Sequence, residues 1–450
     1  MHLGGAEISL IGLLQALDPE KVDIDLFVYS HEGELMKFIP EYVNVLPEMK
    51  SYSMFERPMV ELLKKGHWGV LAARLWSKFK TKLYIKHTQP SKECAASMGY
   101  LGKYVSKVVP NINPDVEYDL AISFLTPHNF VRDHVRAKKK ICWIHTDYTR
   151  IDINAELELP VWDSFDHIIS ISSDVTDTFL KVFPTLAPKI VVVENILSSA
   201  FVRHRAEEGV ADWGGENQNA LKILSIGRFS EQKNFDNLPF ICSIMIEEMK
   251  KLLSIGRFCE AKNYDNVPSI CQRMLQILNE NQNENCLPDD PINHKPSARL
   301  EETLARARTI NLKWYIIGFG GDEALIRQKI VEAGMQDHVI ILGKKENPYP
   351  YIKACDIYVQ PSRYEGKSVT VREAQMLCKP VVVTNYPTAS SQIQNGVDGV
   401  IVPMDNEGCA KDLAKFILDT EKQNKIIDYL KIHDYGNVDE VKNIYELLNR

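Results

Sequence analysis

The sequence predicts an α/β protein made of two domains, each a parallel sheet covered by helices. Short apolar runs alternate with segments of helical periodicity along the chain, a pattern typical of such sheets. In addition, 450 residues with 45% apolar content are enough for two ordinary cores. Two Rossmann-like halves are therefore expected, with the ligand site in the cleft between them.

Each half contains several predicted strands. The halves join around residues 197–219, which are polar and rich in glycine, so we predict one domain over 1–205 and a second over 206–450. The predicted strands of the first half are Asp23–Tyr29, Val43–Leu46, Asp119–Phe124, Lys140–Ile144, Asp166–Ile171 and Lys189–Val193. Those of the second half are Lys222–Ile226, Leu312–Ile317, Val339–Leu342, Asp356–Val359, Pro380–Thr384 and Gly399–Val402.

Composition excludes several classes of protein. A net charge of -7 argues against a general nucleic-acid binder. The nine cysteines form no CxxC pair, as expected for reduced thiols in a cytoplasmic protein. No apolar run is long enough to span a membrane, and the first residues lack the basic leader of a signal peptide. We therefore expect a cytoplasmic chain that is at most attached to a membrane surface.

The segment from Pro361 to Glu373 carries the clearest chemical signal. Glu365 and Glu373 lie eight positions apart, across a turn at Gly366 and the start of a helix predicted over Val369–Cys378. Ser368 or Thr370 is expected to cap this helix, whose first N–H groups attract phosphate. The helical rise separates the two carboxylates by roughly 10 Å, so one nucleotide sugar can touch both. The alternative is a surface-loop glutamate followed by a solvated helix residue.

This segment resembles the signature of glycosyltransferase family 4, retaining enzymes of the GT-B fold. The matching residues are Ser-x-Tyr-Glu-Gly from Ser362, the second glutamate, Lys379-Pro-Val-Val-Val-Thr384, and Asn395-Gly-Val-Asp-Gly-Val-Ile-Val-Pro403. The resemblance implies two Rossmann-like domains facing across a cleft, with no cofactor and no metal. It also implies transfer of a sugar from a UDP- or GDP-sugar to a glycan or lipid-linked acceptor, in bacterial capsule or other cell-envelope polysaccharide synthesis.

The resemblance also assigns roles to residues of the signature. Glu365 is expected to orient the sugar hydroxyls and stabilise positive charge at the anomeric carbon, and Glu373 to bind the ribose. Gly366, Lys367 and Ser368 form the helix start that faces the donor.

Further residues match the family at other strand ends. A histidine at such a position meets the donor sugar, which makes His145 a second catalytic candidate, although a structural histidine is the alternative. The remaining donor-binding candidates are Gly4 and Gly5 before the first helix, Gly318 after a strand, and Asn347 within a stretch whose backbone meets the base. For each glycine the alternative is a simple turn.

The beginning of the chain departs from the family pattern. Gly4-Gly5-Ala6-Glu7 opens an amphipathic helix, whereas a loop of this kind normally follows a strand. We therefore expect the family's first strand to be absent from the N-terminal domain, through truncation or a misassigned gene start.

The second half contains an internal duplication. Leu224–Asn237 recurs as Leu253–Asn266, which defines two 29-residue units at 222–250 and 251–279, followed by a polar loop over 279–297. Each copy is predicted to form a strand, a glycine turn, a basic loop and a helix. The family has one such unit, whose Arg and Lys hold the donor diphosphate. Shorter separation from the strand at Leu312 favours Arg257 and Lys262 over Arg228 and Lys233.

Residues 64–107 are strongly basic and contain aromatic residues. Ten lysines and arginines stand against one acid, Glu93, and are interleaved with residues such as Trp68, Trp76 and Phe79. An ordinary solvated helix face is the default interpretation. The sharper hypothesis is peripheral contact with an anionic membrane that carries a lipid-linked acceptor.

Two other functions remain open at this point. The duplication and the missing strand are compatible with a catalytically silent GT-B subunit that partners another transferase. A GT-B epimerase or phosphorylase is the other possibility.

Overall fold

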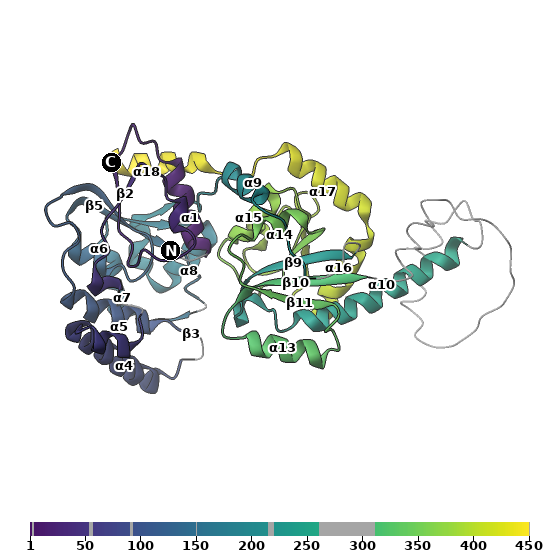
Figure 1. Ribbon diagram of the computed structural model, residues 1–450, viewed down its shortest axis with the longest axis horizontal. Helices are drawn as coiled ribbons and strands as arrows, with labels where there is room; N and C mark the ends of the chain where they lie inside the picture. Colours follow the sequence, from purple (N-terminus) through teal and green to yellow (C-terminus); the bar gives the residue numbers. More distant parts are fainter. Residues whose placement is uncertain are drawn as a thin grey trace. The chain divides into compact units, whose positions relative to one another are not determined.

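The computed structural model describes residues 1, 4–53, 57–90, 93–149, 151–214, 220–260 and 311–449 (Figure 1). The chain forms two compact units. Unit 1 contains 1–208, 364–377 and 433–450, and unit 2 contains 209–363 and 378–432. The predicted division at 205/206 did not include the two later segments that belong to unit 1. Lys262 and the polar loop at 279–297 lie outside the described residues.

Unit 1 is built on a four-stranded parallel sheet. Its strands are ordered β4 (Tyr118–Ser123), β5 (Ala137–Ile144), β7 (His167–Ser170) and β8 (Ile190–Val192). Two short parallel pairs accompany it: β1 (Ile24–Leu26) with β2 (Val43–Val45), and β3 (Glu93–Cys94) with β6 (Ile151–Asp152). All six strands predicted for this half are confirmed. In the described part of the chain, α1 (Gly5–Ala16) is the first element.

The helices of unit 1 follow the α/β alternation. The chain order after α1 is α2 (Lys50–Ser53), α3 (Met59–Lys64), α4 (Trp68–Thr88), α5 (Ala96–Val105), α6 (Asn129–His134), α7 (Ala155–Asp163), α8 (Ser173–Val182) and α9 (Ser199–Glu207). None of the helices in the described ranges is both long and apolar enough to cross a bilayer.

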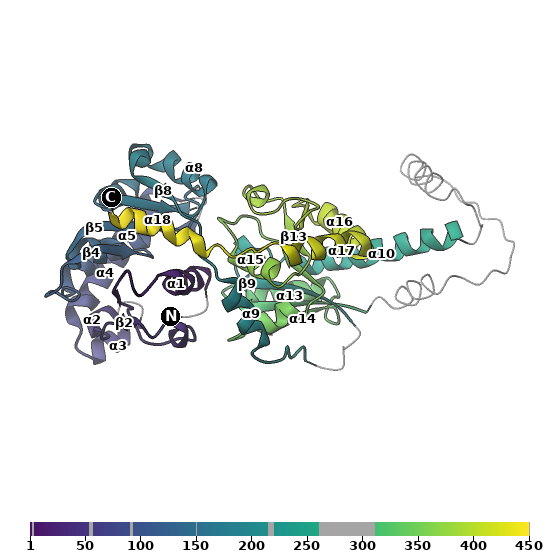
Figure 2. The ribbon, with the colours of Figure 1, turned by 90° about the horizontal axis from the view of Figure 1, so that it is seen from above.

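The C-terminal helix α18 (Val441–Asn449) belongs to unit 1. Helix α18 runs beside β5 in the ribbon (Figure 2), and its residues Val441, Ile444 and Leu447 are buried in the same core as this strand. The Lys139 ammonium donates to the carbonyl of Leu447 at 3.4 Å. Burial of this apolar stripe explains why the last residues belong to unit 1 and not to the domain predicted over 206–450.

Unit 2 contains a six-stranded parallel sheet of Rossmann topology. Its strands are β9 (Leu221–Arg228), β10 (Leu312–Phe319), β11 (Val339–Gly343), β12 (Ile357–Gln360), β13 (Val381–Thr384) and β14 (Val400–Val402). They are ordered β11-β10-β9-β12-β13-β14, so numbering from β9 gives 3-2-1-4-5-6. The six predicted strands are confirmed, as is the α/β class. The helices described in this unit are α10 (Leu238–Glu260), α13 (Glu323–Glu332), α14 (Tyr349–Ala354), α16 (Asn406–Leu418) and α17 (Thr420–Ile432).

The two copies of the duplicated sequence have different structures. The first copy forms β9, which pairs with β10 and β12. The second copy begins inside α10, which continues to Glu260, so the strand predicted from Leu253 is wrong. Identical local sequence therefore forms a strand in one place and a helix in the other. Pairing with two neighbouring strands decides the first outcome, since β propensity depends strongly on such contacts.

Gly318 is required by close packing between β9 and β10. A Cβ atom there would overlap the Gly227 carbonyl and lie 2.7 Å from the Phe229 ring. We expect Gly318→Ala to lower the free energy of unfolding of unit 2 by about 1–3 kcal/mol, measured by urea unfolding. Gly321→Ala is the control, because no atom lies within 4 Å of its Cβ position. Equal losses from both variants would contradict the packing argument.

Candidate functional site

The switch point of the unit 2 sheet lies between β9 and β12. At this position the strand order reverses, and open α/β sheets bind ligands beyond the carboxyl ends of the two strands. The loop after β9 contains Lys233, and the loop after β12 begins at Pro361. The first copy of the duplication is therefore located where this topology favours a ligand.

An ion pair joins the two loops at the switch point. The Arg363 guanidinium donates to both carboxylate oxygens of Asp236, at 3.1 and 3.3 Å, and to the carbonyl of Glu231. The Arg363 backbone N–H donates to the Gln232 carbonyl at 2.8 Å. These bonds hold the start of the Pro361–Glu373 segment against the loop that carries Lys233. The sequence analysis missed this pair, since 127 positions separate its members.

The Lys233 side chain lies over the carboxyl end of β9. A Cβ atom at Gly227 would be 3.0 Å from Cε of Lys233 and 3.2 Å from its Cγ. Glycine at this position leaves room for the lysine stem to lie flat across the strand end, and any larger residue would press against that stem. Gly318 packs on the Gly227 carbonyl from the next strand, so two of the predicted site residues, Lys233 and Gly318, contact the same glycine.

A buried polar network fixes the end of β12. The Tyr358 hydroxyl donates to Gln360 Oε1 at 2.6 Å, and Gln360 Nε2 donates to the Ser362 hydroxyl at 2.8 Å. Thr384, at the end of β13, donates to the Ser362 carbonyl at 2.5 Å. The sequence contains one pattern from which this network could have been predicted, namely polar residues at the ends of apolar strands. It rigidifies the backbone just before Glu365.

The loop before α15 (Val369–Met376) packs inside unit 1. A Cβ atom at Gly366 would lie 3.4 Å from the side chains of Ile171 and Val175 and 3.8 Å from the His145 carbonyl. Gly366 and His145, both predicted as site residues, are therefore neighbours at the carboxyl ends of β5 and β7. At the start of α1, a Cβ atom on Gly5 would contact Val369 at 3.5 Å.

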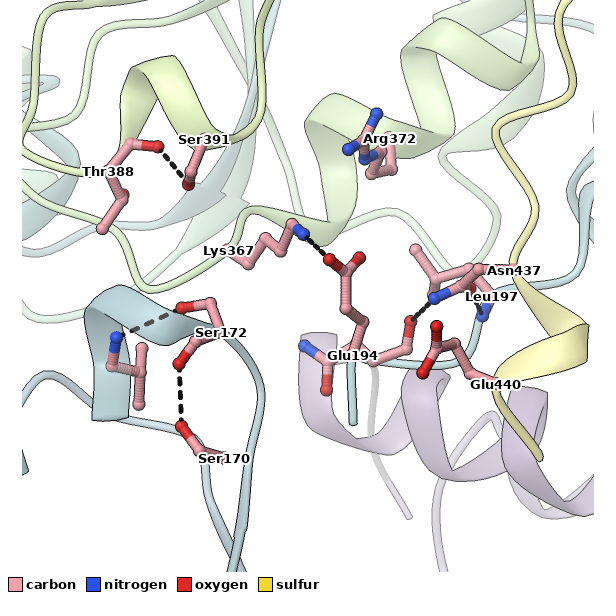
Figure 3. Close-up of polar contacts among 12 residues, drawn as sticks. Ser170, Ser172, Glu194, Leu197, Lys367, Arg372, Thr388, Ser391, Asn437 and Glu440 are labelled. Atoms are coloured by element: carbon pink, nitrogen blue, oxygen red, sulfur yellow. Dashed lines mark hydrogen bonds and ion pairs between the residues drawn. The ribbon is translucent and has the colours of Figure 1, made fainter. Parts of the chain in front are cut away.

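Lys367 forms an ion pair with Glu194, just after β8 (Figure 3). The Lys367 side chain is 10% exposed and that of Glu194 is 40% exposed. The bond crosses 173 positions of sequence, and the sequence analysis did not identify Glu194. It fastens the loop before α15 to the edge of the unit 1 sheet.

Both signature carboxylates are buried. Glu365 is 7% exposed and Glu373 is 1% exposed, so the alternative of a solvated helix residue is wrong for Glu373. Val371 and Ala374 are also buried, as the predicted apolar stripe requires. Ser368 occupies the N-cap position with extended backbone, but its hydroxyl makes no capping hydrogen bond. The first N–H groups of α15 are therefore not capped by this side chain, which leaves water, backbone or a ligand as their partners.

His145 has a defined tautomer. Its Nε2 lies 3.0 Å from the Phe124 carbonyl, which can only accept, so Nε2 carries the proton and Nδ1 is an acceptor. Burial lowers the pKa of His145 to about 4, against the opposing effect of the Phe124 carbonyl. The imidazole is therefore neutral at pH 7 and can accept a hydrogen bond from a hydroxyl.

A second histidine, His128, is buried near His145. Its Nδ1 lies 2.8 Å from the Ser123 hydroxyl, and its ring packs edge-on against Trp162 with centroids 4.5 Å apart. Burial, with a smaller contribution from His145, lowers the pKa of His128 to about 3. This residue was not among the sequence-predicted candidates.

We expect the stability of unit 1 to fall as the pH drops from 6.5 towards 3. An unfolded histidine, with a pKa near 6.5, takes up a proton in this window that folded His128 does not. At pH 4 the protonation difference at His128 lowers the free energy of unfolding on the order of 3 kcal/mol. Urea unfolding at pH 7 and pH 4 measures this change. The His128→Gln variant, which does not titrate, should show a flatter profile. A wild-type profile as flat as the variant's would contradict this prediction.

Asn347 lies before α14. Its side-chain oxygen accepts from the Tyr349 backbone N–H at 3.3 Å, which helps start this short helix.

The predicted site residues are divided between the two units. Of the predicted donor-binding residues, Arg228, Lys233, Gly318 and Asn347 belong to unit 2. Gly4, Gly5, Lys367, Ser368 and the two glutamates belong to unit 1, as do Gly366 and His145. Arg257 lies in α10.

Comparison with protein families identifies one domain in the chain. Residues 294–433 match the family model "Glycosyl transferases group 1". A Rhizobium meliloti lipopolysaccharide core biosynthesis mannosyltransferase, LpsB, is 28% identical over 99 residues, which are 22% of this chain and 28% of that protein. A Campylobacter jejuni N-acetylgalactosaminyltransferase, acting on a diphospho-undecaprenol-linked sugar, is 29% identical over 132 residues, 29% of this chain and 36% of that protein. The chain thus matches about a third of the length of these curated relatives.

Solved structures have the same fold as the part of this chain that the structure describes. Anabaena Alr3699/HepE, in complex with UDP and glucose, has a TM-score of 0.57 at 15% identity and covers 99% of this chain and 96% of its own. A glycosyltransferase from Rickettsia africae has a TM-score of 0.53 at 16% identity, with 99% and 94% covered. Together with the two parallel sheets, these structures confirm the predicted GT-B fold.

Proposed function

From the glycosyl transferases group 1 domain at 294–433, we propose that this protein transfers a sugar from a nucleoside diphosphate sugar to a glycan or lipid-linked acceptor. Retention of anomeric configuration and a role in cell-surface polysaccharide synthesis, as in capsule, are part of the proposal. The relatives that act in lipopolysaccharide synthesis and on undecaprenol-linked sugars support the latter. The cysteine pattern favours a cytoplasmic setting.

The observation that carries the proposal is the joined pair of loops at the β9/β12 switch point. Breaking a glycosidic bond to a diphosphate increases negative charge on the leaving group, which needs cations placed beforehand. Lys233, lying across Gly227, and Arg228 at the end of β9 are proposed to supply them. This assignment replaces the sequence-based preference for Arg257 and Lys262, because the second copy begins as helix instead of strand.

Glu365 and Glu373 are proposed to act on the sugar and the ribose, respectively. Their burial favours this role, since a charge acts more strongly on a reacting group in a site that excludes water. His145 is proposed to accept a hydrogen bond from a sugar hydroxyl through Nδ1, which the tautomer leaves as an acceptor. Gly5 and Gly366 allow close approach of backbone to ligand.

The test is a screen of UDP- and GDP-sugars, first by thermal shift and then by release of nucleoside diphosphate. UDP-glucose comes first, because the Anabaena structure contains UDP and glucose. The proposal expects one donor to raise the melting temperature and to be turned over when acceptor is present. Binding without release, with every acceptor tried, would instead favour a catalytically silent subunit. Formation of a sugar 1-phosphate from a glycan and added inorganic phosphate would favour a phosphorylase, and an isomerised nucleotide sugar an epimerase.

A further inference from the structure

Helix α4 presents apolar side chains on both of its faces. Val70, Leu71 and Ala73 point inward and are buried in a core with Tyr52 and Val105. On the opposite side, Trp68, Leu75, Trp76, Phe79 and Leu83 are between 45% and 63% exposed, and we name these five residues the α4 face. Their spacing of three, four and seven positions aligns them along one side of the helix. A helix packed on a protein core normally presents polar residues to water instead.

The preceding helix also has exposed apolar residues. Val60 and Leu63 of α3 are 64% and 50% exposed, and α3 contacts α4. Exposed apolar residues that occur singly are normal on a protein surface. Five of them along one side of a single helix, with two more on a helix that contacts it, are typical of an interaction site.

Positive charge surrounds the α4 face. Helix α4 contains Arg74, Lys78, Lys80, Lys82 and Lys86 and no acidic residue, although the whole chain has a net charge of -7. Lys80 extends over the Trp76 ring, with its nitrogen 5.4 Å from the centroid. In helical projection Lys80 lies on one side of the aromatic row, and Lys78 and Lys82 lie on the other.

We infer that the α4 face docks on an anionic lipid bilayer. Aromatic and leucine side chains along one side of a helix enter the boundary between headgroups and acyl chains, and flanking lysines meet the lipid phosphates. A second copy of the chain fits this surface poorly, because a twofold contact would bring the cationic flanks of two α4 helices together, and α4 itself contains no acidic residue. The inference goes beyond the proposed sugar transfer, since docking requires no catalysis.

The test is co-sedimentation of the full chain with vesicles. Phosphatidylcholine vesicles are compared with vesicles that also contain phosphatidylglycerol. The wild type should bind the anionic vesicles only, with a blue shift of tryptophan fluorescence from Trp68 and Trp76. Combining Lys78→Gln, Lys82→Gln and Lys86→Gln should lower the partition coefficient on the order of 100-fold. Combining Trp76→Ser and Phe79→Ser should lower it roughly tenfold.

A matched control removes three lysines elsewhere: Lys411, Lys415 and Lys425, on α16 and α17, are replaced by glutamine. This variant has the same net charge as the α4 lysine variant and should bind like the wild type. Binding that is equal with and without phosphatidylglycerol, or equal losses from the two lysine variants, would overturn the inference. A third result would also overturn it: the wild type does not bind vesicles but forms a dimer, and the Trp76/Phe79 variant is monomeric. That result would assign the α4 face to self-association. Donor turnover in solution does not depend on this surface. A loss of donor turnover would therefore contradict the proposed function and not the inferred docking on a bilayer.

Discussion

Replacing Lys233 by alanine is expected to lower kcat/KM for donor turnover on the order of 100- to 1000-fold. Lys233 lies across Gly227 at the carboxyl end of β9, next to the point where the sheet order reverses. A positioned cation there stabilises the leaving diphosphate in the transition state, and removal of one such group has effects of this size in other enzymes. The measurement is nucleoside diphosphate release with the donor found by screening.

The duplicated sequence provides a matched control for this experiment. Lys262 occupies the same place in the second copy as Lys233 in the first, with Arg257 matching Arg228. Lys262→Ala changes the same residue type in the same local sequence, and we expect kcat/KM close to that of the wild type. Loss of activity from Lys262→Ala alone would restore the sequence-based assignment to the second copy.

Replacing Glu365 by glutamine is expected to lower kcat on the order of 1000-fold while changing the donor KM little. The substitution keeps the size of a side chain that is only 7% exposed and removes its charge. Positive charge at the anomeric carbon develops mainly in the transition state, so the loss should fall on kcat. Single-turnover kinetics at saturating donor measures this step directly.

Glu373→Gln is the comparison for this second experiment. The ribose is bound equally in the ground state and the transition state, so this variant should raise the donor KM and leave kcat nearly unchanged. Melting temperatures check that both variants fold, because Glu373 is buried as well. Wild-type kcat in Glu365→Gln would remove the proposed role of this carboxylate.

The strands were predictable because their signal is local. Apolar runs such as Ile141 to Ile144 are buried, and their length and composition already indicate a strand. The loop and helix from Glu365 to Met376 were predictable for the same reason, since a glycine turn precedes a short apolar periodicity.

Long-range contacts were not predictable from one sequence. Lys367 and Glu194 lie 173 positions apart, and nothing near either residue indicates the other. The same holds for Arg363 with Asp236 and for the return of α18 to the first core. The strand predicted for the second copy of the duplication was also wrong, because linear distance to the next strand does not decide which copy pairs in the sheet.

By itself, the sequence determined the α/β class, the twelve main strands and the segment on which the proposed chemistry depends. Periodicity and turn residues act over a few positions, so they can be recognised in one chain. Only the tertiary structure decided that the first copy, not the second, forms strand β9. It also decided that Glu373 is buried and that an apolar row of α4 is left exposed. Burial and strand pairing arise between residues far apart in the chain, and local pattern does not contain them.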